Sequence, residues 1–173
     1  YSLTSTFLTL VVGLLAAVRL NQIASSKLAP VYRVLIVLPW MIPTLVTAIG
    51  YAWILNTLYG IATYGLELLG LPAIGWLAEY SMTTTITVSI WRAFPLVTVV
   101  ILAALQAIPP DLYDAAKIDG ASGLTTFIHV TFPNIKGTFF VLTIMDTIFY
   151  FNLFDLIWLL THGGPADLTN VLT

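Results

Sequence analysis

The chain has 173 residues, of which 59% are hydrophobic and only 8% are charged, and its formal net charge at pH 7 is −2. Soluble domains carry roughly 25% charged residues, so this composition excludes a water-soluble globular protein and predicts that apolar side chains face lipid. Cysteine is absent, only two histidines occur, and no basic cluster is present, which argues against a thiolate site, a metal centre and nucleic-acid binding.

Four apolar stretches are long enough to cross a bilayer, for which a helix needs about 20 residues. Within hydrocarbon every backbone N–H and C=O group must be satisfied inside its own segment, so each stretch is expected to be a helix. The chain begins inside an apolar run without a methionine, and we expect it to be a fragment with further helices on both sides. The sequence therefore predicts an all-α, polytopic transmembrane helical bundle, with four spans at about 1–20, 34–56, 82–107 and 138–160.

Lysine and arginine predict the orientation, because cytoplasmic loops are enriched in them. Arg19, Lys27 and Arg33 flank the first connection, and Lys117 and Lys136 lie in the third, whereas the second connection and the C-terminal segment have none. The predicted cytoplasmic loops are 21–33 and 108–137, and the predicted outer segments are 57–81 and 161–173.

The cytoplasmic loop 108–137 is expected to form a helix-turn-helix on the membrane surface. Asp111 can cap a first short helix, and Gly120 can end it with a positive φ. A second short helix is expected to start at Ser122 and to stop before Pro133. Small residues at the centre of the loop would let another protein approach closely, which suits docking, although a simple connector resting on lipid headgroups would have the same pattern.

The loop sequence DAAKIDGA, followed by HVTFP, resembles the EAA motif of the permease subunits of ATP-binding-cassette (ABC) importers. It departs from the family pattern by conservative replacements at Asp114, Val130 and Phe132. The resemblance extends in order over nearly the whole chain. It implies a permease of the carbohydrate-uptake branch, similar to the maltose type. It also implies the type I importer fold and a location in the bacterial inner (plasma) membrane. The further blocks are LPWMIP (38–43), WRAFP (91–95), AALQAIPPDLYDAAKIDGA (103–121) and FNLFDLIWLLTHGGP (151–165).

The resemblance implies that the first short helix is a coupling helix, which docks on a cytoplasmic ABC ATPase dimer. The chain has no G-x-x-x-x-G-K-[ST] run that could hold a nucleotide, so no cofactor is expected in this chain. ATP and Mg would bind to the partner ATPase, and this protein would not be an enzyme. Other implied partners are a second homologous permease subunit, an extracytoplasmic sugar-binding protein and membrane lipid. The residues expected to contact the ATPase are Asp114, Ala115, Ala116, Asp119, Gly120 and Ala121.

Two charged residues, Arg92 and Asp146, come near the middle of their spans, where a charge is costly and usually marks function. We expect them to face the protein interior and to pair directly or through water, either in a transport pathway or as a structural interhelical pair. Trp40 and Thr44 are four residues apart and are expected to share a helix face. The resemblance places a substrate pathway at Trp40, Thr44, Ser89, Arg92, Ala93, Asp146, Phe149 and Tyr150.

The hypothesis that these features favour is a permease subunit that translocates a sugar, most simply a di- or oligosaccharide, by alternating access coupled to ATP hydrolysis in its partner. A secondary transporter with Asp146 as the proton carrier is the first alternative. The second is an intramembrane enzyme using Asp146, Asn152 and Asp155, although no protease motif or metal-ligand spacing supports it.

Overall fold

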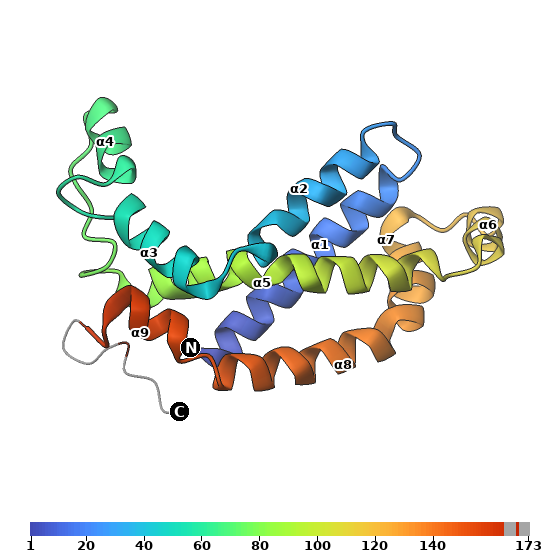
Figure 1. Ribbon diagram of the computed structural model, residues 1–173. Coiled ribbons are helices and arrows are strands. Elements are labelled where there is room, and N and C mark those ends of the chain that lie inside the picture. The colour runs from blue at the N-terminus through green and yellow to red at the C-terminus, as the bar shows by residue number, and fades with distance from the viewer. Residues whose placement is uncertain (165–168, 170–173) are drawn as a thin grey trace.

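The computed structural model describes residues 1–164 and Thr169 of the chain (Figure 1). The described residues form helices and no strand, as the composition predicted. In chain order the helices are α1 (Ser2–Gln22), α2 (Ala29–Met41), α3 (Thr44–Ile54), α4 (Ile61–Leu68), α5 (Ser81–Gln106), α6 (Pro110–Ile118), α7 (Gly123–Thr126), the π-helical turn η1 (Phe127–Thr131), α8 (Phe132–Phe151) and α9 (Asp155–Thr161).

Three helical segments in the described part of the chain are long and apolar enough to cross a membrane. They are α1, α5 and the continuous run Gly123–Phe151. The pair α2 and α3 passes the same test only when both are taken together, and then the number of candidate spans is four. The fold is therefore a polytopic helical membrane bundle.

The predicted single span at 34–56 is wrong in one respect, because α2 and α3 are separate helices whose axes differ by 93°. The break lies at Ile42 and Pro43, where Ile42 has an extended backbone with φ −76° and ψ 127°. A proline has no N–H group and its ring disfavours the α conformation of the preceding residue, so helix continuity is lost there. Consequently Trp40 and Thr44 lie on different helices and do not share a face, contrary to expectation.

The predicted fourth span, 138–160, also differs from the structure, because α8 already ends at Phe151 and α9 is a separate helix. At its start, α8 continues directly from α7 and η1, so the second helix of the loop does not stop before Pro133. In η1 the N–H of Phe132 donates to the carbonyl of Phe127, five residues earlier. This wider turn accommodates Pro133, which has no N–H group to donate. The side-chain amide of Asn134 donates a hydrogen bond to the Val130 carbonyl at 2.6 Å.

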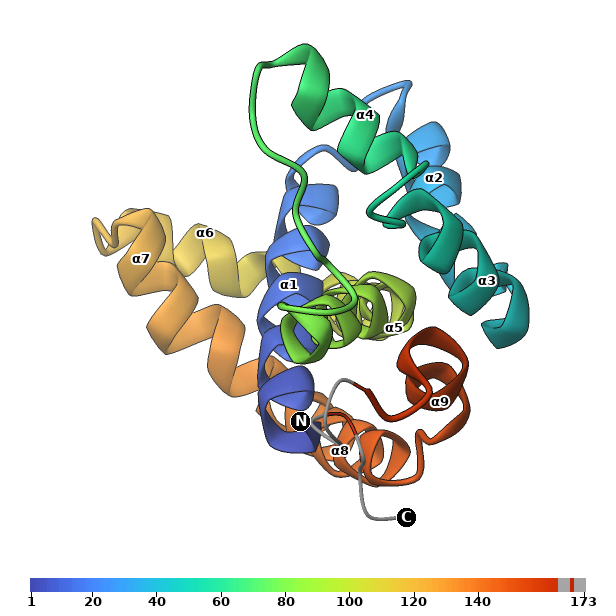
Figure 2. The ribbon, with the colours of Figure 1, turned by 90° about the vertical axis from the view of Figure 1, so that its left-hand side faces the viewer.

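Helix α5 is the central element, with α1, α3, α8 and α9 around it, as the nearly end-on view in Figure 2 shows. The contact between α1 and α5 is close at Gly13, where an added Cβ atom would lie 2.5 Å from the Val97 Cγ1 atom. A second, smaller core joins α3, α5 and α9 through Ala48, Val88, Leu156 and Leu160. The main core joins α1, α5 and α8 and includes Leu10, Ala17, Leu20, Val97, Ile101, Leu105 and Leu142.

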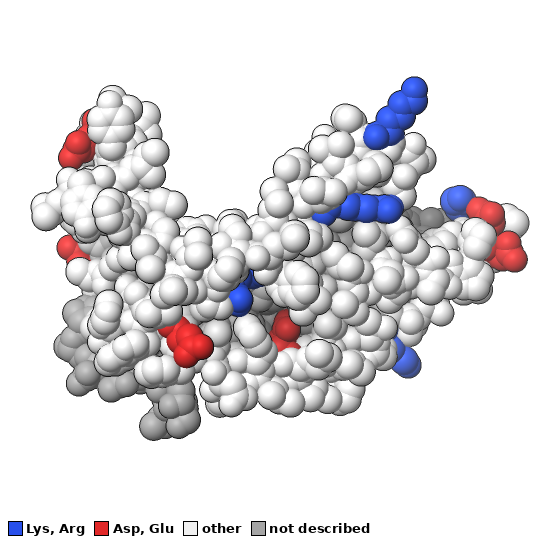
Figure 3. Space-filling model, in the orientation of Figure 1, with Lys and Arg blue, Asp and Glu red and all other residues white. Residues whose placement is uncertain are grey.

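The connections between helices gather at two ends of the molecule (Figure 1). The α1–α2 connection lies at the same end as α6 and α7, whereas α4 and α9 lie at the opposite end. Most of the face between them is uncharged in Figure 3. The distribution of lysine and arginine predicted that these connections would group in this way. That the end with the α1–α2 connection, α6 and α7 faces the cytoplasm stays a prediction.

Candidate functional site

The first candidate site is the loop between α5 and α8, whose first helix is α6. The N-cap of α6 is Pro109, and Pro110 occupies the first helical position, where the missing N–H group costs nothing. Asp111 lies inside the first turn and its side chain does not cap the helix, so the expected capping role is wrong. A carboxylate in the first turn still interacts favourably with the helix dipole.

The turn between α6 and α7 follows the sequence prediction closely. Gly120 has a φ of +72°, and the N–H of Ala121 donates to the Ala116 carbonyl at 2.9 Å, as in a Schellman motif. Ser122 is the N-cap of α7, and its hydroxyl accepts a hydrogen bond from the Thr125 N–H. The two short helices are therefore held in a fixed relation by local backbone chemistry.

Five of the six predicted coupling residues line one groove of about 640 Å³ between α6 and α7–η1. The exception is Asp114, which makes a 2.9 Å ion pair with Lys117 on the exposed side of α6. Such an exposed pair is weak and easily exchanged for another partner. Ile118 and Leu124 are 87% and 71% exposed, which is typical of a protein-binding surface when apolar side chains lie on an aqueous loop. The five groove residues are Ala115, Ala116, Asp119, Gly120 and Ala121.

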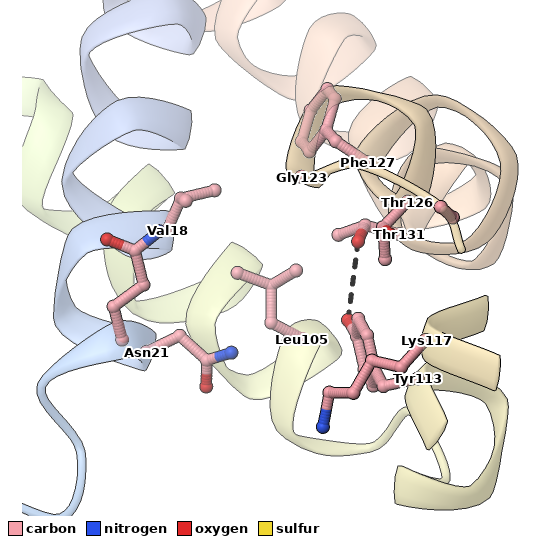
Figure 4. Close-up of a pocket in the computed structure, with 11 residues that line it drawn as sticks. Val18, Asn21, Leu105, Tyr113, Lys117, Gly123, Thr126, Phe127 and Thr131 are labelled. Atoms are coloured by element: carbon pink, nitrogen blue, oxygen red, sulfur yellow. Dashed lines mark hydrogen bonds between the residues drawn. The ribbon is translucent and has the colours of Figure 1, made fainter. Parts of the chain in front are cut away.

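A second cavity, of about 400 Å³, separates this loop from the end of α1 (Figure 4). Asn21 of α1 and Lys117 of α6 line it from two sides, with Leu105 of α5 between them in the view. The hydroxyl groups of Tyr113 and Thr131 are 3.4 Å apart, which links α6 to η1. The two arms of the loop are thus joined to each other and are separated from α1 by open space.

The second candidate site is a buried cluster of hydroxyl groups where α1, α5 and α8 meet. Tyr150 of α8 is 1% exposed, and its hydroxyl lies 2.6 Å from that of Thr9 on α1. The Tyr150 hydroxyl also donates to the Ser89 carbonyl of α5 at 3.4 Å. The Ser89 hydroxyl in turn lies 2.7 Å from that of Tyr1. These hydrogen bonds connect three helices inside the apolar core.

The two intramembrane charges lie next to this cluster and do not form a direct pair. Asp146 is 7% exposed and lies four residues before Tyr150 on α8, and Arg92 lies three residues after Ser89 on α5. The described part of the chain offers no hydrogen-bond partner to Asp146 Oδ2 or to Arg92 Nε, and no ion pair joins the two residues there. Of the two expected arrangements, the direct ion pair is therefore absent in this conformation, and pairing through water stays a prediction. Two buried polar atoms remain available to another group.

The other predicted pathway residues are less enclosed. Trp40 is 48% exposed and is the penultimate residue of α2, and Thr44 is the first residue of α3 beyond the break. Phe149 is partly exposed on α8, with its ring centroid 5.5 Å from that of Tyr150. Ala93 is half-buried on α5. The structure thus brings Ser89, Arg92, Asp146 and Tyr150 together and leaves Trp40 and Thr44 at the α2–α3 break.

Sequence reasoning missed the contribution of α1 to this cluster. Ser2 donates to the Tyr150 carbonyl at 3.1 Å, and Thr9 binds the Tyr150 hydroxyl. Ser5 and Thr6 are also buried, and their hydroxyl groups have no partner among the described residues. The signal was present, because hydroxyl side chains at positions 2, 5, 6 and 9 follow helical spacing in an otherwise apolar span.

These features define a class of protein: a multi-pass helical membrane protein with a helix-turn-helix loop between two of its long helices. The sequence pattern of the family described as "binding-protein-dependent transport system inner membrane component" matches residues 9–172. The chain belongs to this family, and it is therefore a multi-pass inner-membrane protein. The resemblance inferred from the EAA motif is confirmed.

Curated relatives and solved structures agree with this assignment. The chain is 34% identical over 175 residues to the trehalose/maltose transport system permease protein MalF of Thermococcus litoralis, covering 100% of this chain and 59% of the relative. It is 32% identical over 176 residues to the maltodextrin transport system permease protein MdxF of Bacillus subtilis, covering 96% and 40%. The crystal structure of a bacterial ABC transporter that imports the acidic polysaccharide alginate matches with a TM-score of 0.83 at 25% identity, covering 98% of this chain and 62% of that chain. The chain thus spans less than two thirds of the length of these proteins.

Proposed function

We propose that this chain is the core of a permease subunit of an ABC sugar importer. In this proposal the α6 helix docks on a cytoplasmic ATPase, and the buried cluster between α1, α5 and α8 belongs to the pathway of a di- or oligosaccharide. The observation that supports it most directly is the groove formed by small residues between α6 and α7–η1, at the end of two long membrane helices.

The connections of the loop suit the transmission of movement. Only residues 107–109 separate α5 from α6, and α7, η1 and α8 are continuous. A displacement of α6 would therefore be passed to α5 and α8, because helices transmit movement along their axes with little bending. These are the two helices that carry Ser89 and Tyr150, so docking and the polar cluster are mechanically connected. Hydrolysis of ATP would take place in the partner.

A saccharide suits the chemistry of the cluster. Hydroxyl groups need hydrogen-bond partners, and aromatic rings cover the apolar faces of a sugar. Ser89, Tyr150 and the free atoms of Arg92 and Asp146 supply the polar partners, and Phe149 supplies a partly exposed ring. The names of the relatives, which include maltose, maltodextrin and alginate transport, support a saccharide substrate.

The proposed partners extend to both sides of the membrane. A second permease subunit would complete the pathway, and an extracytoplasmic sugar-binding protein would deliver the substrate at the end that carries α4 and α9. The family description, which names dependence on a binding protein, supports the latter. A solved structure of the bacterial alginate transporter in complex with an alginate pentasaccharide-bound periplasmic protein, which matches with a TM-score of 0.82, supports it as well.

Substitutions at Gly120 test the docking role of α6 in the assembled transporter. An added Cβ atom at Gly120 meets nothing within 4 Å, so the side chain of Gly120→Trp starts in open space at the groove, where the ATPase would dock. The positive φ makes any side chain unfavourable, by roughly 1–2 kcal/mol, and Gly120→Ala is the control that has this strain without the bulk. We expect Gly120→Trp to abolish ATP-driven sugar uptake and copurification of the ATPase, and Gly120→Ala to retain both.

Normal coupled uptake in Gly120→Trp proteoliposomes would contradict the proposal. The secondary-transporter alternative predicts a different result, namely uptake that survives removal of the ATPase and stops when the proton gradient is collapsed. Labelled-sugar uptake with each of the two energy sources removed in turn separates these outcomes.

A further inference from the structure

A third cavity, distinct from both candidate sites, lies between α1, α2 and α5 at the end of the molecule that carries the α1–α2 connection. Its volume is about 290 Å³. Two polar side chains line it, Arg33 of α2 and Gln106 at the end of α5. Most of the remaining lining is apolar, from Leu20, Ile36, Val99 and Leu102. The cavity is thus a hydrophobic groove with a cation beside it.

The segment that connects α1 to α2 beside this groove carries charge of one sign. The segment 19–33 contains three basic residues, Arg19, Lys27 and Arg33, and no acidic residue. Arg33 is exposed, and it has neither a carboxylate partner nor a side-chain hydrogen bond within the described residues. Figure 3 shows basic side chains projecting from this part of the molecule, and the acidic side chains at the same end lie farther out, over α6. No described residue therefore supplies a carboxylate that pairs with Arg33, so the groove favours an anionic occupant.

The depth of the groove matches the boundary between headgroups and hydrocarbon. Gln106 is the last residue of α5, and Val99 lies seven residues earlier, which is roughly 10 Å deeper along the helix. With Arg33 at headgroup level, the side chains of Ile36 and Val99 lie at the level of acyl chains. A free phosphate would need no apolar slot, and an apolar helix in the groove would leave the guanidinium without a counter-charge.

We propose that this groove binds one anionic phospholipid of the cytoplasmic leaflet, with its phosphate on Arg33 and an acyl chain between α1, α2 and α5. Basic pockets between membrane helices on the cytoplasmic side are suited to such headgroups. The lipid would tie α2 to α1 and α5 on the cytoplasmic side of the α2–α3 break. The proposal rests on the orientation given under the proposed function, and it does not depend on the identity of the sugar.

The assembled transporter in detergent, titrated with phosphatidylglycerol or phosphatidylcholine and measured by native mass spectrometry, provides the test. We expect tighter retention of phosphatidylglycerol by the unchanged protein. Arg33→Gln should weaken that retention about fivefold, the effect of one basic residue near a membrane surface. The matched control is Lys27→Gln, which removes an equal charge from the neighbouring α1–α2 connection. Lys27 does not line the groove, so this variant should change retention much less.

A variant that fills the apolar slot tests the acyl-chain half of the proposal. Ala103 is an exposed residue of α5 that lines the groove, so Ala103→Trp should reduce retention while Arg33 is intact. Size-exclusion chromatography shows whether the Ala103→Trp variant assembles. If Ala103→Trp does not assemble, the comparison of Arg33→Gln with Lys27→Gln decides whether the groove is a specific lipid site. Equal effects of Arg33→Gln and Lys27→Gln would show only diffuse attraction to anionic lipid, and would overturn the specific site.

Crosslinking distinguishes a lipid from a neighbouring helix in the groove. The chain has no cysteine, so a single cysteine at Val99 can carry a photoactivatable label. A crosslink to phosphatidylglycerol supports the proposal, and a crosslink to another protein subunit instead of lipid overturns it. Uptake measured after reconstitution of the same preparations into proteoliposomes is a separate readout from lipid retention in detergent, so failure of the transport proposal would be recognised separately.

Discussion

The buried hydrogen bond between Thr9 and Tyr150 allows the polar cluster to be tested quantitatively. Both side chains are essentially inaccessible, and their hydroxyl oxygens are 2.6 Å apart. Thr9→Val and Tyr150→Phe each remove one hydroxyl with little change in shape. Interhelical hydrogen bonds in membrane proteins average about 0.6 kcal/mol in double-mutant cycles, with a maximum of about 1.7 kcal/mol. Full burial and the short distance place this one in the upper part of that range, so we expect a coupling energy of about 1 kcal/mol.

The assay is reversible unfolding of the permease subunit in mixed micelles, followed by circular dichroism, for the two single variants and the double variant. Thr98 provides the matched control, because it is equally buried and its hydroxyl binds only the Phe94 carbonyl of its own helix, at 2.8 Å. The Thr98→Val and Tyr150→Phe pair should be additive within about 0.5 kcal/mol. The same additivity for Thr9 and Tyr150 would refute the claim that this bond holds α1 to α8.

Further substitutions test other parts of the fold and the pathway. Gly13→Ala should destabilise the protein by roughly 1–3 kcal/mol, because its Cβ would overlap α5, whereas Gly137→Ala has open space and should be neutral or stabilising in the same unfolding assay. Pro43→Ala should straighten the junction between α2 and α3, which a longer distance between spin labels at 35 and 50 would reveal. Arg92→Ala and Asp146→Ala should each reduce sugar uptake more than assembly with the ATPase, and normal uptake in both would place the pathway elsewhere.

The helical class, the helix-turn-helix between α5 and α8 and the family could be predicted because their signals are local. An apolar run of sufficient length must be a helix in lipid, and a glycine at the end of a short helix predicts the positive φ that Gly120 adopts. The predicted residues that line the groove between α6 and α7–η1 lie within a few positions of one another in the chain, so one short motif contains all of them.

The breaks in the helices were harder to predict because they depend on competition between local and surrounding structure. Pro95 lies inside an uninterrupted α5, and Pro133 lies in the first turn of α8, yet Pro43 accompanies a complete break. All three lack an N–H group, so composition alone does not distinguish them. The π-helical turn before Pro133 and the extended backbone at Ile42 decide the outcome, and both are properties of the folded backbone.

The buried cluster could not be assembled from the sequence because its members come from three helices. Tyr150 and Ser89 were predicted as groups that a sugar could reach, whereas in this conformation both are buried and bound to α1 or to each other. A hydroxyl group can exchange one partner for another at small net cost, because a sugar hydroxyl replaces the bond that is lost. A displacement of α8 relative to α1 would therefore expose Tyr150 without leaving it unsatisfied. If the proposed function holds, the same hydroxyl groups would keep the pathway closed and would bind substrate after the loop between α5 and α8 has moved these helices away from α1.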